Sequence, residues 1–341
     1  MTIGVCGYGF SGSGAVTDLL KEFSDTQVLD AVEFKLTYMQ DGLEDLYYHL
    51  VTHPVRFYSS DVAIRRFKRL VAYLDKTYGP LTQGKFMLIT NEFIQEITQV
   101  TWKGSSSFHR IDSSKSARFF KYQIAEKFRK VAYKYAKLWW SFPDTEMYLS
   151  ISPERYMSAA QNLISELIAC LVDSNKTVVI NQAFPADRPE FSFPYFNDPK
   201  AICVSRDPRD MYLLAKFVAK HRARFIPTDS VDDFIVYYNT IMSNITQDEL
   251  DKKNILRISF EDLIYRYQET IGTIKEFTGI SNHTAPLRYF NPEISIGNTN
   301  LRGKFPQYQS DIKKIEQALE SWLYRFDEYD MQNPASHGTV F

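Results

Sequence analysis

The stretch that decides the fold is Gly7-Tyr-Gly-Phe-Ser-Gly-Ser-Gly14, which places four glycines and two serines within eight residues. The apolar run Thr2–Cys6 before it predicts a buried strand, and Gly14–Phe23 after it has apolar residues at helical spacing. A glycine-rich turn between a strand and a helix start lets the backbone approach a ligand, and the unpaired N–H groups there attract phosphate. The sequence therefore predicts a phosphate-binding loop in an α/β fold.

Taken alone, this loop fits three kinds of phosphate site. As Gly7-x-Gly-x-x-Gly12 it has dinucleotide-binding spacing, with Asp30 about where a ribose-binding acid should lie. As Gly9-x-x-x-x-Gly14 it has the spacing of an ATPase or kinase P-loop, but Ala15-Val16 stand where that loop needs lysine and a hydroxyl residue. The third possibility is the 5′-phosphosulfate loop of sulfotransferases, which ends in Ser-Gly-Thr and is matched by Ser13-Gly14.

The remaining pattern is α/β at both ends and helical in between. Apolar or β-branched runs bounded by turn residues predict strands at Gln27–Asp30, Lys176–Asn181, Lys200–Ser205 and Asn254–Ser259. Phe260–Gly279 is expected to be one helix that stops at a glycine. Strands that alternate with helices indicate a central parallel sheet covered on both faces. We expect one domain, 1–341, with a mainly helical insertion or cap at about 41–174.

Composition excludes several classes of protein. Hydrophobic residues make up 44% of the 341 residues and aromatic residues 15%, which is enough for a large core and excludes global disorder. A net charge of −1 gives no general attraction to nucleic acid or to an anionic membrane, so any anion site must be local. The three cysteines are expected to be buried packing residues. Because neither a signal peptide nor a long apolar run is visible, we expect a cytoplasmic protein without a membrane span.

Within the helical block, Lys115–Trp140 alternates aromatic and aliphatic residues with lysines and arginines. This spacing is typical of an amphipathic helix with a solvated basic face. The alternative is a basic groove for a polyanionic acceptor.

A second segment selects among the three interpretations of the loop. Ala201-Ile-Cys-Val-Ser-Arg-Asp-Pro-Arg-Asp210 places Arg206 at a strand end beside a helix start, which is a second position suited to phosphate. The segment resembles the 3′-phosphate segment of the PAPS-dependent sulfotransferase family, and Ile255–Leu263 resembles that family's later strand-to-helix segment. A dinucleotide oxidoreductase has no reason to carry either. The resemblance covers residues 2–36 and 176–326.

The resemblance implies a P-loop-like sulfotransferase fold and transfer of a sulfuryl group from PAPS to a hydroxyl or amine, with PAP as product and no metal. It implies a donor site at Gly9, Phe10, Ser11, Gly12, Ser13, Gly14 and Ala15 on the 5′ side, Arg206 on the 3′ side, and Arg302, Gly303 and Lys304 in a covering loop. The aromatic content and the helical block favour a glycan as acceptor, as in a bacterial carbohydrate-type member. The alternatives are a P-loop kinase-like or dinucleotide-binding enzyme and a non-catalytic nucleotide-binding protein.

The resemblance also implies the catalytic groups. Glu33 follows the second strand, like the glutamate that takes the acceptor proton in heparan-type members, and Lys35, two residues on, projects to the same side of an extended chain. None of the five histidines between residues 49 and 283 follows a central strand, as the base of cytosolic-type members does; Asn181-Gln182 stands there instead. Two positions depart from the family pattern, because Gly12 replaces a basic residue and Leu214 replaces a hydroxyl.

Overall fold

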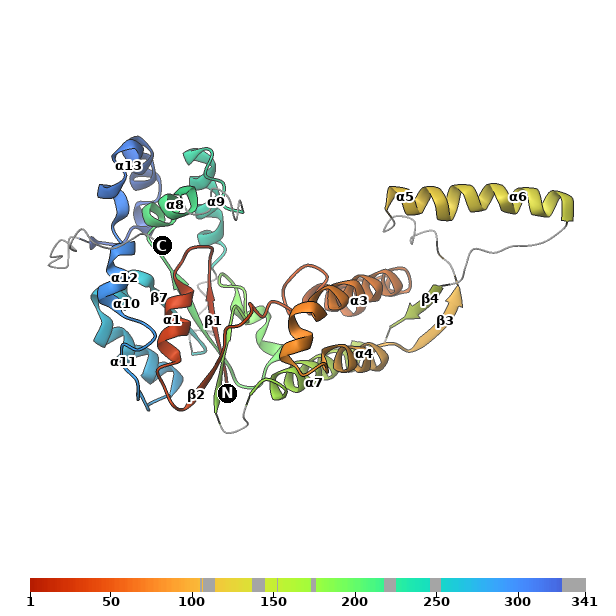
Figure 1. Ribbon diagram of the computed structural model, residues 1–341, viewed down its shortest axis with the longest axis horizontal. Coiled ribbons are helices and arrows are strands. Elements are labelled where there is room, and N and C mark those ends of the chain that lie inside the picture. Colours follow the sequence, from red (N-terminus) through yellow and green to blue (C-terminus); the bar gives the residue numbers. More distant parts are fainter. Residues whose placement is uncertain are drawn as a thin grey trace. The chain divides into compact units, whose positions relative to one another are not determined.

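The computed structural model describes residues 1–104, 106, 114–136, 145–151, 153–172, 176–217, 225–245 and 253–326 (Figure 1). The chain divides into two compact units. The first joins Met1–Thr37 to Leu171–Phe341, and the second is Tyr38–Cys170.

The first unit is built on a five-stranded parallel sheet, which confirms the α/β class expected from the sequence. Its strands are β1 (Thr2–Gly7), β2 (Thr26–Leu29), β5 (Thr177–Asn181), β6 (Pro199–Ser205) and β7 (Ile255–Ser259). They lie in the order β2-β5-β1-β6-β7, so β1 is the central strand and pairs with both β5 and β6. In this register Cys6 lies beside Cys203, and both thiols are buried and free.

Helices flank this sheet and bury its apolar side chains. They are α1 (Ser13–Leu20), α8 (Pro208–Phe217), α9 (Val231–Ser243), α10 (Phe260–Tyr265), α11 (Tyr267–Thr278), α12 (Pro292–Ser295) and α13 (Gln309–Ala318). Ile3 and Val5 of β1 are fully buried in one core cluster with Leu19 of α1 and Leu263 of α10. A second cluster joins α8, α9 and α13. Burial on both faces explains why these strands read as nearly continuous apolar runs.

The expectation of a single helix over Phe260–Gly279 was wrong. The chain forms α10 and α11, separated at Arg266, whose φ of −123° and ψ of 40° are not helical. The side chain of Thr270 donates a hydrogen bond to the carbonyl of Asp262, within α10, over 2.9 Å. The expected stop is present, because Gly279 ends α11 with a left-handed φ of 78°.

The second unit is mainly helical. Its helices are α2 (Leu43–Tyr47), a π-helical turn at Tyr48–Thr52, α3 (Arg56–Leu81), α4 (Phe86–Ile97), α5 (Lys115–Arg118), a π-helical segment Phe119–Ile124, α6 (Ala125–Ala136) and α7 (Tyr156–Ala169). Phe67 of α3, Phe93 of α4 and Tyr156 of α7 pack edge to face in its core. The sequence did not predict the antiparallel pair β3 (Val100–Gly104) and β4 (Thr145–Leu149).

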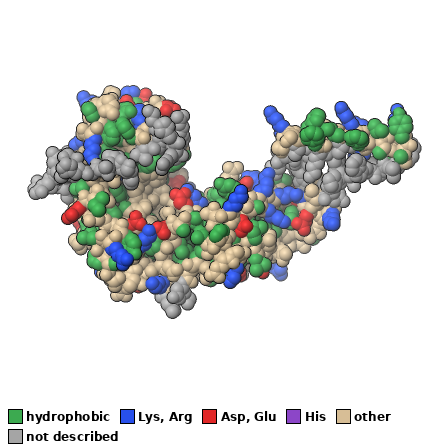
Figure 2. Space-filling model, in the orientation of Figure 1, with side chains coloured by type: hydrophobic (Ala, Val, Ile, Leu, Met, Phe, Trp, Pro, Cys, Tyr) green, Lys and Arg blue, Asp and Glu red, His purple; other side chains and the backbone are tan. Residues whose placement is uncertain are grey.

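Helix α5, the π-helical segment and α6 follow one another without a break. Figure 2 shows hydrophobic and basic side chains together along this stretch. None of the helices in the described ranges combines the length and apolar composition that a bilayer crossing requires.

Candidate functional site

The carboxyl edge of the parallel sheet gathers most of the residues that the sequence marked. The glycine loop leaves β1, Gln182 follows β5, Arg206 follows β6, and Glu33 comes four residues after β2. In open α/β sheets, ligands bind outside this edge, where connections from neighbouring strands run in opposite directions. The chain leaves β1 toward β2 and leaves β6 toward β7, so the β1–β6 boundary is such a point.

The glycine loop has a backbone that few other residues would tolerate. Gly12 has a φ of 87°, and a Cβ there would lie 2.4 Å from the ring of Phe260. Phe10 also has a positive φ, 64°, which costs free energy for a bulky residue. The loop is therefore held in a strained conformation by its surroundings.

The side chain of Gln182 connects the two ends of this loop. Its Oε1 accepts a hydrogen bond from the N–H of Gly7 over 3.3 Å, and its Nε2 donates to Oγ of Ser13 over 3.2 Å. Gln182 itself has a φ of 56°, and its N–H donates to the carbonyl of Val5. From the sequence, Asn181-Gln182 was expected to contact donor or acceptor; the structure shows that Gln182 instead bonds to both ends of the glycine loop.

The loop still has groups available to an anion. The N–H of Ser11 donates to Tyr8 and that of Ala15 to Gly12, so these two are already used. The N–H groups of the first helical turn, including those of Ser13 and Gly14, have no carbonyl partner within α1. Oγ of Ser11 is buried without a hydrogen-bond partner among the described residues. A buried unpaired hydroxyl beside a helix start is consistent with an anion in this cradle.

Arg206 is buried at the end of β6 and bridges two loops. Its Nη1 donates to the carbonyl of Phe10 over 3.0 Å, and its Nη2 donates to the carbonyl of Asn298. The guanidinium lies 4.5 Å from the centre of the Phe260 ring. Within the described part of the chain its Nε has no partner, and only 5% of the residue is exposed. The structure thus gives Arg206 a bracing contact that the sequence did not predict, and the N–H of its Nε remains without a partner among the described residues.

Three buried carboxylates surround Arg206. Burial, reinforced by neighbouring carboxylates, raises the pKa of Asp210 to about 6 and that of Glu261 to about 8, although the Arg206 guanidinium opposes both shifts. Asp207 instead forms a bidentate ion pair with Arg209, with a shortest N–O distance of 2.7 Å. Burial of Glu261 among these carboxylates therefore favours its protonated form.

The expected covering loop is tied to the first turn of α8 by Asp210. That carboxylate accepts the N–H groups of Asn300 and Leu301 over 2.7 and 2.8 Å. Arg302 lies 3.4 Å from the carboxylate of Glu316, and Lys304 donates to the carbonyl of Gly297 over 2.7 Å. Gly303 is exposed. The segment expected to bind the 3′-phosphate therefore also anchors the segment expected to cover the donor.

An aromatic side chain that the sequence did not mark lies over the loop. The ring of Phe225 stacks on that of Phe10 with centroids 6.2 Å apart, and a Cβ on Gly9 would approach it to 2.2 Å. Phe225 is nevertheless 58% exposed. Exposed aromatic rings beside a phosphate cradle can stack on a base, but no pattern in the sequence distinguished this phenylalanine from the other aromatic residues.

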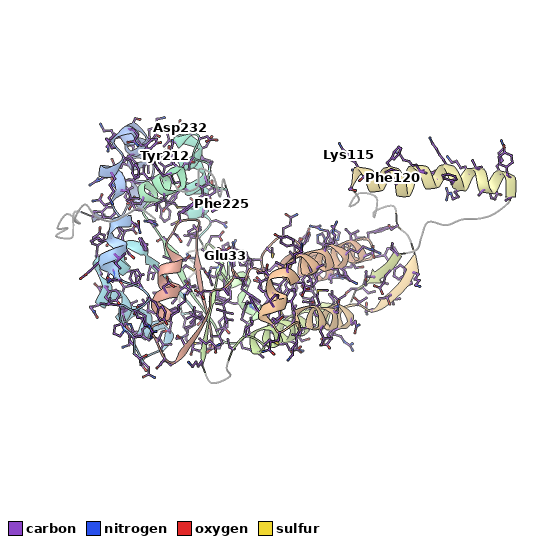
Figure 3. All side chains as sticks on the ribbon, viewed as in Figure 1. Glu33, Lys115, Phe120, Tyr212, Phe225 and Asp232 are labelled. Atoms are coloured by element: carbon purple, nitrogen blue, oxygen red, sulfur yellow. The ribbon has the colours of Figure 1, made fainter. Side chains whose placement is uncertain are left out.

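The structure brings Glu33 and Lys35 together, as their spacing predicted. Their side chains form an ion pair at 2.5 Å, and both are partly exposed. The residue between them, Phe34, is buried and donates its N–H to the carbonyl of Asn181 at the end of β5. Glu33 is thereby fixed beside the strand end that leads to Gln182. Figure 3 labels Glu33 and Phe225 at the same end of the sheet.

Two alternative interpretations of the loop find less support. In the dinucleotide-binding fold, the first two strands are neighbours, whereas here β5 separates β1 from β2. Asp30, the proposed ribose acid, is paired with Lys21. Val16, at the place of the P-loop hydroxyl, is fully buried in the core, as is Leu214, at the place of the missing sulfotransferase hydroxyl.

Comparison with known proteins adds no relative, because no protein-family model and no curated protein matches the sequence. Across the described ranges, no cluster of three or more His, Cys, Asp or Glu side chains is arranged to hold a metal ion.

Proposed function

We propose that this protein is a sulfotransferase that moves a sulfuryl group from PAPS to a hydroxyl or amine of an acceptor. The observation that carries the proposal is the hydrogen bond from Nη1 of Arg206 to the carbonyl of Phe10. This bond joins the segment after β6 to the glycine loop after β1. Two positions suited to phosphate at the switch point of one sheet fit a nucleotide with phosphates at both ends. PAPS, with a 5′-phosphosulfate and a 3′-phosphate, has this form.

The proposed reaction is an in-line displacement. Glu33 takes the proton of the acceptor hydroxyl or amine as its oxygen or nitrogen bonds to sulfur. The bond from sulfur to the bridging phosphate oxygen breaks, and its electron pair leaves with PAP. In this reaction the N–H groups of Ser13 and Gly14, with the unpartnered hydroxyl of Ser11, would stabilise the charge that develops on the leaving phosphate. Lys35 would balance the charge of Glu33.

Thermal unfolding of the full chain with PAP, NAD and ATP tests the proposal. A ligand at a hundredfold excess over its dissociation constant stabilises the folded state by roughly 2.7 kcal/mol, so we expect PAP to raise Tm clearly and NAD not at all. Stabilisation by NAD with none by PAP would refute the assignment. PAP binding without any sulfuryl transfer would instead indicate a non-catalytic nucleotide-binding protein.

The substitution Gly14→Asp provides a sharper test of where the nucleotide binds. A Cβ at Gly14 has no atom within 4 Å, so the folded protein accommodates it. An acidic side chain in the first turn favours the helix dipole but repels a phosphate placed there. The matched control is Gly272→Asp, because Gly272 has equally open surroundings and lies on α11. We expect PAP binding to be lost in the first variant and kept in the second, with similar Tm values without ligand.

A further inference from the structure

The helical segment Lys115–Ala136 is the largest feature that the proposed function does not use. It contains seven lysines and arginines and one glutamate, a net charge of +6 in a chain whose total is −1. It also contains six aromatic residues. Figure 3 labels Lys115 and Phe120 on this segment.

Several large apolar side chains of this segment are exposed. On α6, Phe128, Val131 and Tyr135 have helical spacing and share one face, yet each is more than half exposed, and Tyr135 is 77% exposed. Phe120, in the preceding π-helical turn, is 66% exposed. An amphipathic helix in a globular protein normally buries such a face against a core.

The charges are placed beside this face. Lys127, Lys130 and Lys134 each immediately precede one of its residues, so they form a parallel stripe about 100° around the helix axis. All three lysines are exposed. Glu126 is 3.6 Å from Lys130 and leaves the positive charge of this stripe largely unbalanced. If the apolar stripe faced a surface, long lysine side chains at this angle would reach out at its margin.

We infer that Lys115–Ala136 is a docking helix for the surface of a membrane containing anionic lipids. Exposed aromatic and aliphatic side chains on one face, with lysines on its flank, match a helix that lies in the plane of the lipid headgroups. The apolar stripe enters the boundary of the acyl chains, and the lysines meet lipid phosphates. A soluble polyanion would pair with the lysines but leave Phe128 and Tyr135 in water. A second copy of the helix would bring two strongly positive segments together.

Cosedimentation of the full chain with lipid vesicles tests this inference, independently of any transferase activity. We expect binding to phosphatidylcholine vesicles that contain about one third phosphatidylglycerol to exceed binding to pure phosphatidylcholine by roughly tenfold or more, and to weaken as salt is added. Equal binding to both kinds of vesicle, or to neither, would overturn the inference.

Two variants separate the apolar from the charged contribution. Phe128→Ser combined with Tyr135→Ser keeps every charge, whereas the triple change of Lys127, Lys130 and Lys134 to Gln keeps every apolar group. Each should weaken binding to the anionic vesicles by about tenfold or more. If only the lysine variant loses binding, and the wild type binds heparin as tightly as vesicles, the partner is a soluble polyanion and the membrane inference is wrong.

The chain offers matched controls for both variants. Tyr73 on α3 is 71% exposed, so Tyr73→Ser removes an equally accessible aromatic ring elsewhere. Changing the exposed Lys76, Lys253 and Lys313 to Gln removes the same total charge outside the helix. These controls should bind vesicles like the wild type. Because all the substituted side chains are exposed, we expect Tm to be unchanged in every variant.

Discussion

Nη1 of Arg206 lies 3.0 Å from the carbonyl oxygen of Phe10, across 196 residues of sequence. Phe10 needs such support, because its φ of 64° is unfavourable for a phenylalanine. The same guanidinium also donates to Asn298, so it fixes the glycine loop relative to the segment that Asp210 anchors. Arg206 therefore has two separable properties to test, its contribution to stability and its proposed contact with a 3′-phosphate.

Arg206→Ala should destabilise the protein without ligand by about 2–4 kcal/mol. The substitution removes the donor from two partly buried carbonyl groups and a cation that opposes the raised pKa values of both Asp210 and Glu261. Urea unfolding followed by circular dichroism measures the loss. A variant as stable as the wild type would show that the bracing contact contributes nothing.

The same variant should bind PAP more weakly by about 2–3 kcal/mol, beyond any loss for adenosine 5′-phosphosulfate, which lacks the 3′-phosphate. Isothermal titration with both nucleotides at a temperature where the variant stays folded measures the difference. Equal losses would assign Arg206 to the loop structure alone, which is the role that its present contacts already show.

Two substitutions of Gln182 distinguish the effect of its side-chain hydrogen bonds on the loop from the effect of its own backbone strain. Gln182→Ala and Gln182→Gly both remove the bonds to Gly7 and Ser13, but glycine also relieves the positive φ of 56°. We expect both variants to bind PAP about tenfold more weakly or worse, with the glycine variant more stable than the alanine variant by about 1 kcal/mol. If glycine restores the affinity as well, strain rather than the amide contacts governs the loop.

Glu33→Gln tests the proposed base. Glutamine keeps the size of the side chain but cannot accept the acceptor's proton, so sulfuryl transfer should fall roughly 10²–10⁴-fold while PAP affinity stays nearly constant. Slow hydrolysis of PAPS by water serves as the assay until an acceptor is found. Lys35→Gln is the control for loss of the ion pair alone. A rate that falls only because PAP binding collapses would make Glu33 a residue that shapes the pocket.

Glu261 should make stability decline toward alkaline pH. Its folded-state pKa of about 8 lies above the ordinary value of 4.5, so between these values the folded state holds a proton that the unfolded state has released. The contribution of Glu261 is therefore fully present below pH 4.5 and lost as pH rises through 8, by at most roughly 1.4 kcal/mol per pH unit.

The variant Glu261→Gln mimics the protonated form and should lack this component of the decline. The free energy of unfolding is measured for both proteins at pH 5, 6.5 and 8, and the wild-type value is subtracted from that of the variant at each pH. The titration of Asp210 largely cancels in this difference. We expect the free energy of unfolding of the variant to increase relative to that of the wild type as pH rises. Parallel curves for the two proteins would mean that Glu261 is ionised in the folded state at neutral pH.

Local signals predicted most of the sheet. Each strand was recognisable as a short apolar run between turn residues, and the observed strands begin and end within one residue of the expected bounds. The helix over Phe260–Gly279 was harder, because the break at Arg266 accompanies a hydrogen bond from Thr270 to Asp262 and no glycine or proline marks it. The pair β3–β4 was missed because its strands are more than forty residues apart and β3 is largely exposed, so that it lacks an apolar run.

For the candidate site, the sequence by itself determined which residues stand at strand ends: the glycine loop, Gln182, Arg206 and the pair Glu33 and Lys35. Strand ends are set by local backbone preference and burial, which a sequence displays directly. Only the tertiary structure decided that β5 lies between β1 and β2, that Gln182 connects the ends of the loop, and that Arg206 reaches Phe10. These relationships depend on pairing between segments far apart in the chain, and a single sequence carries no record of which segments meet.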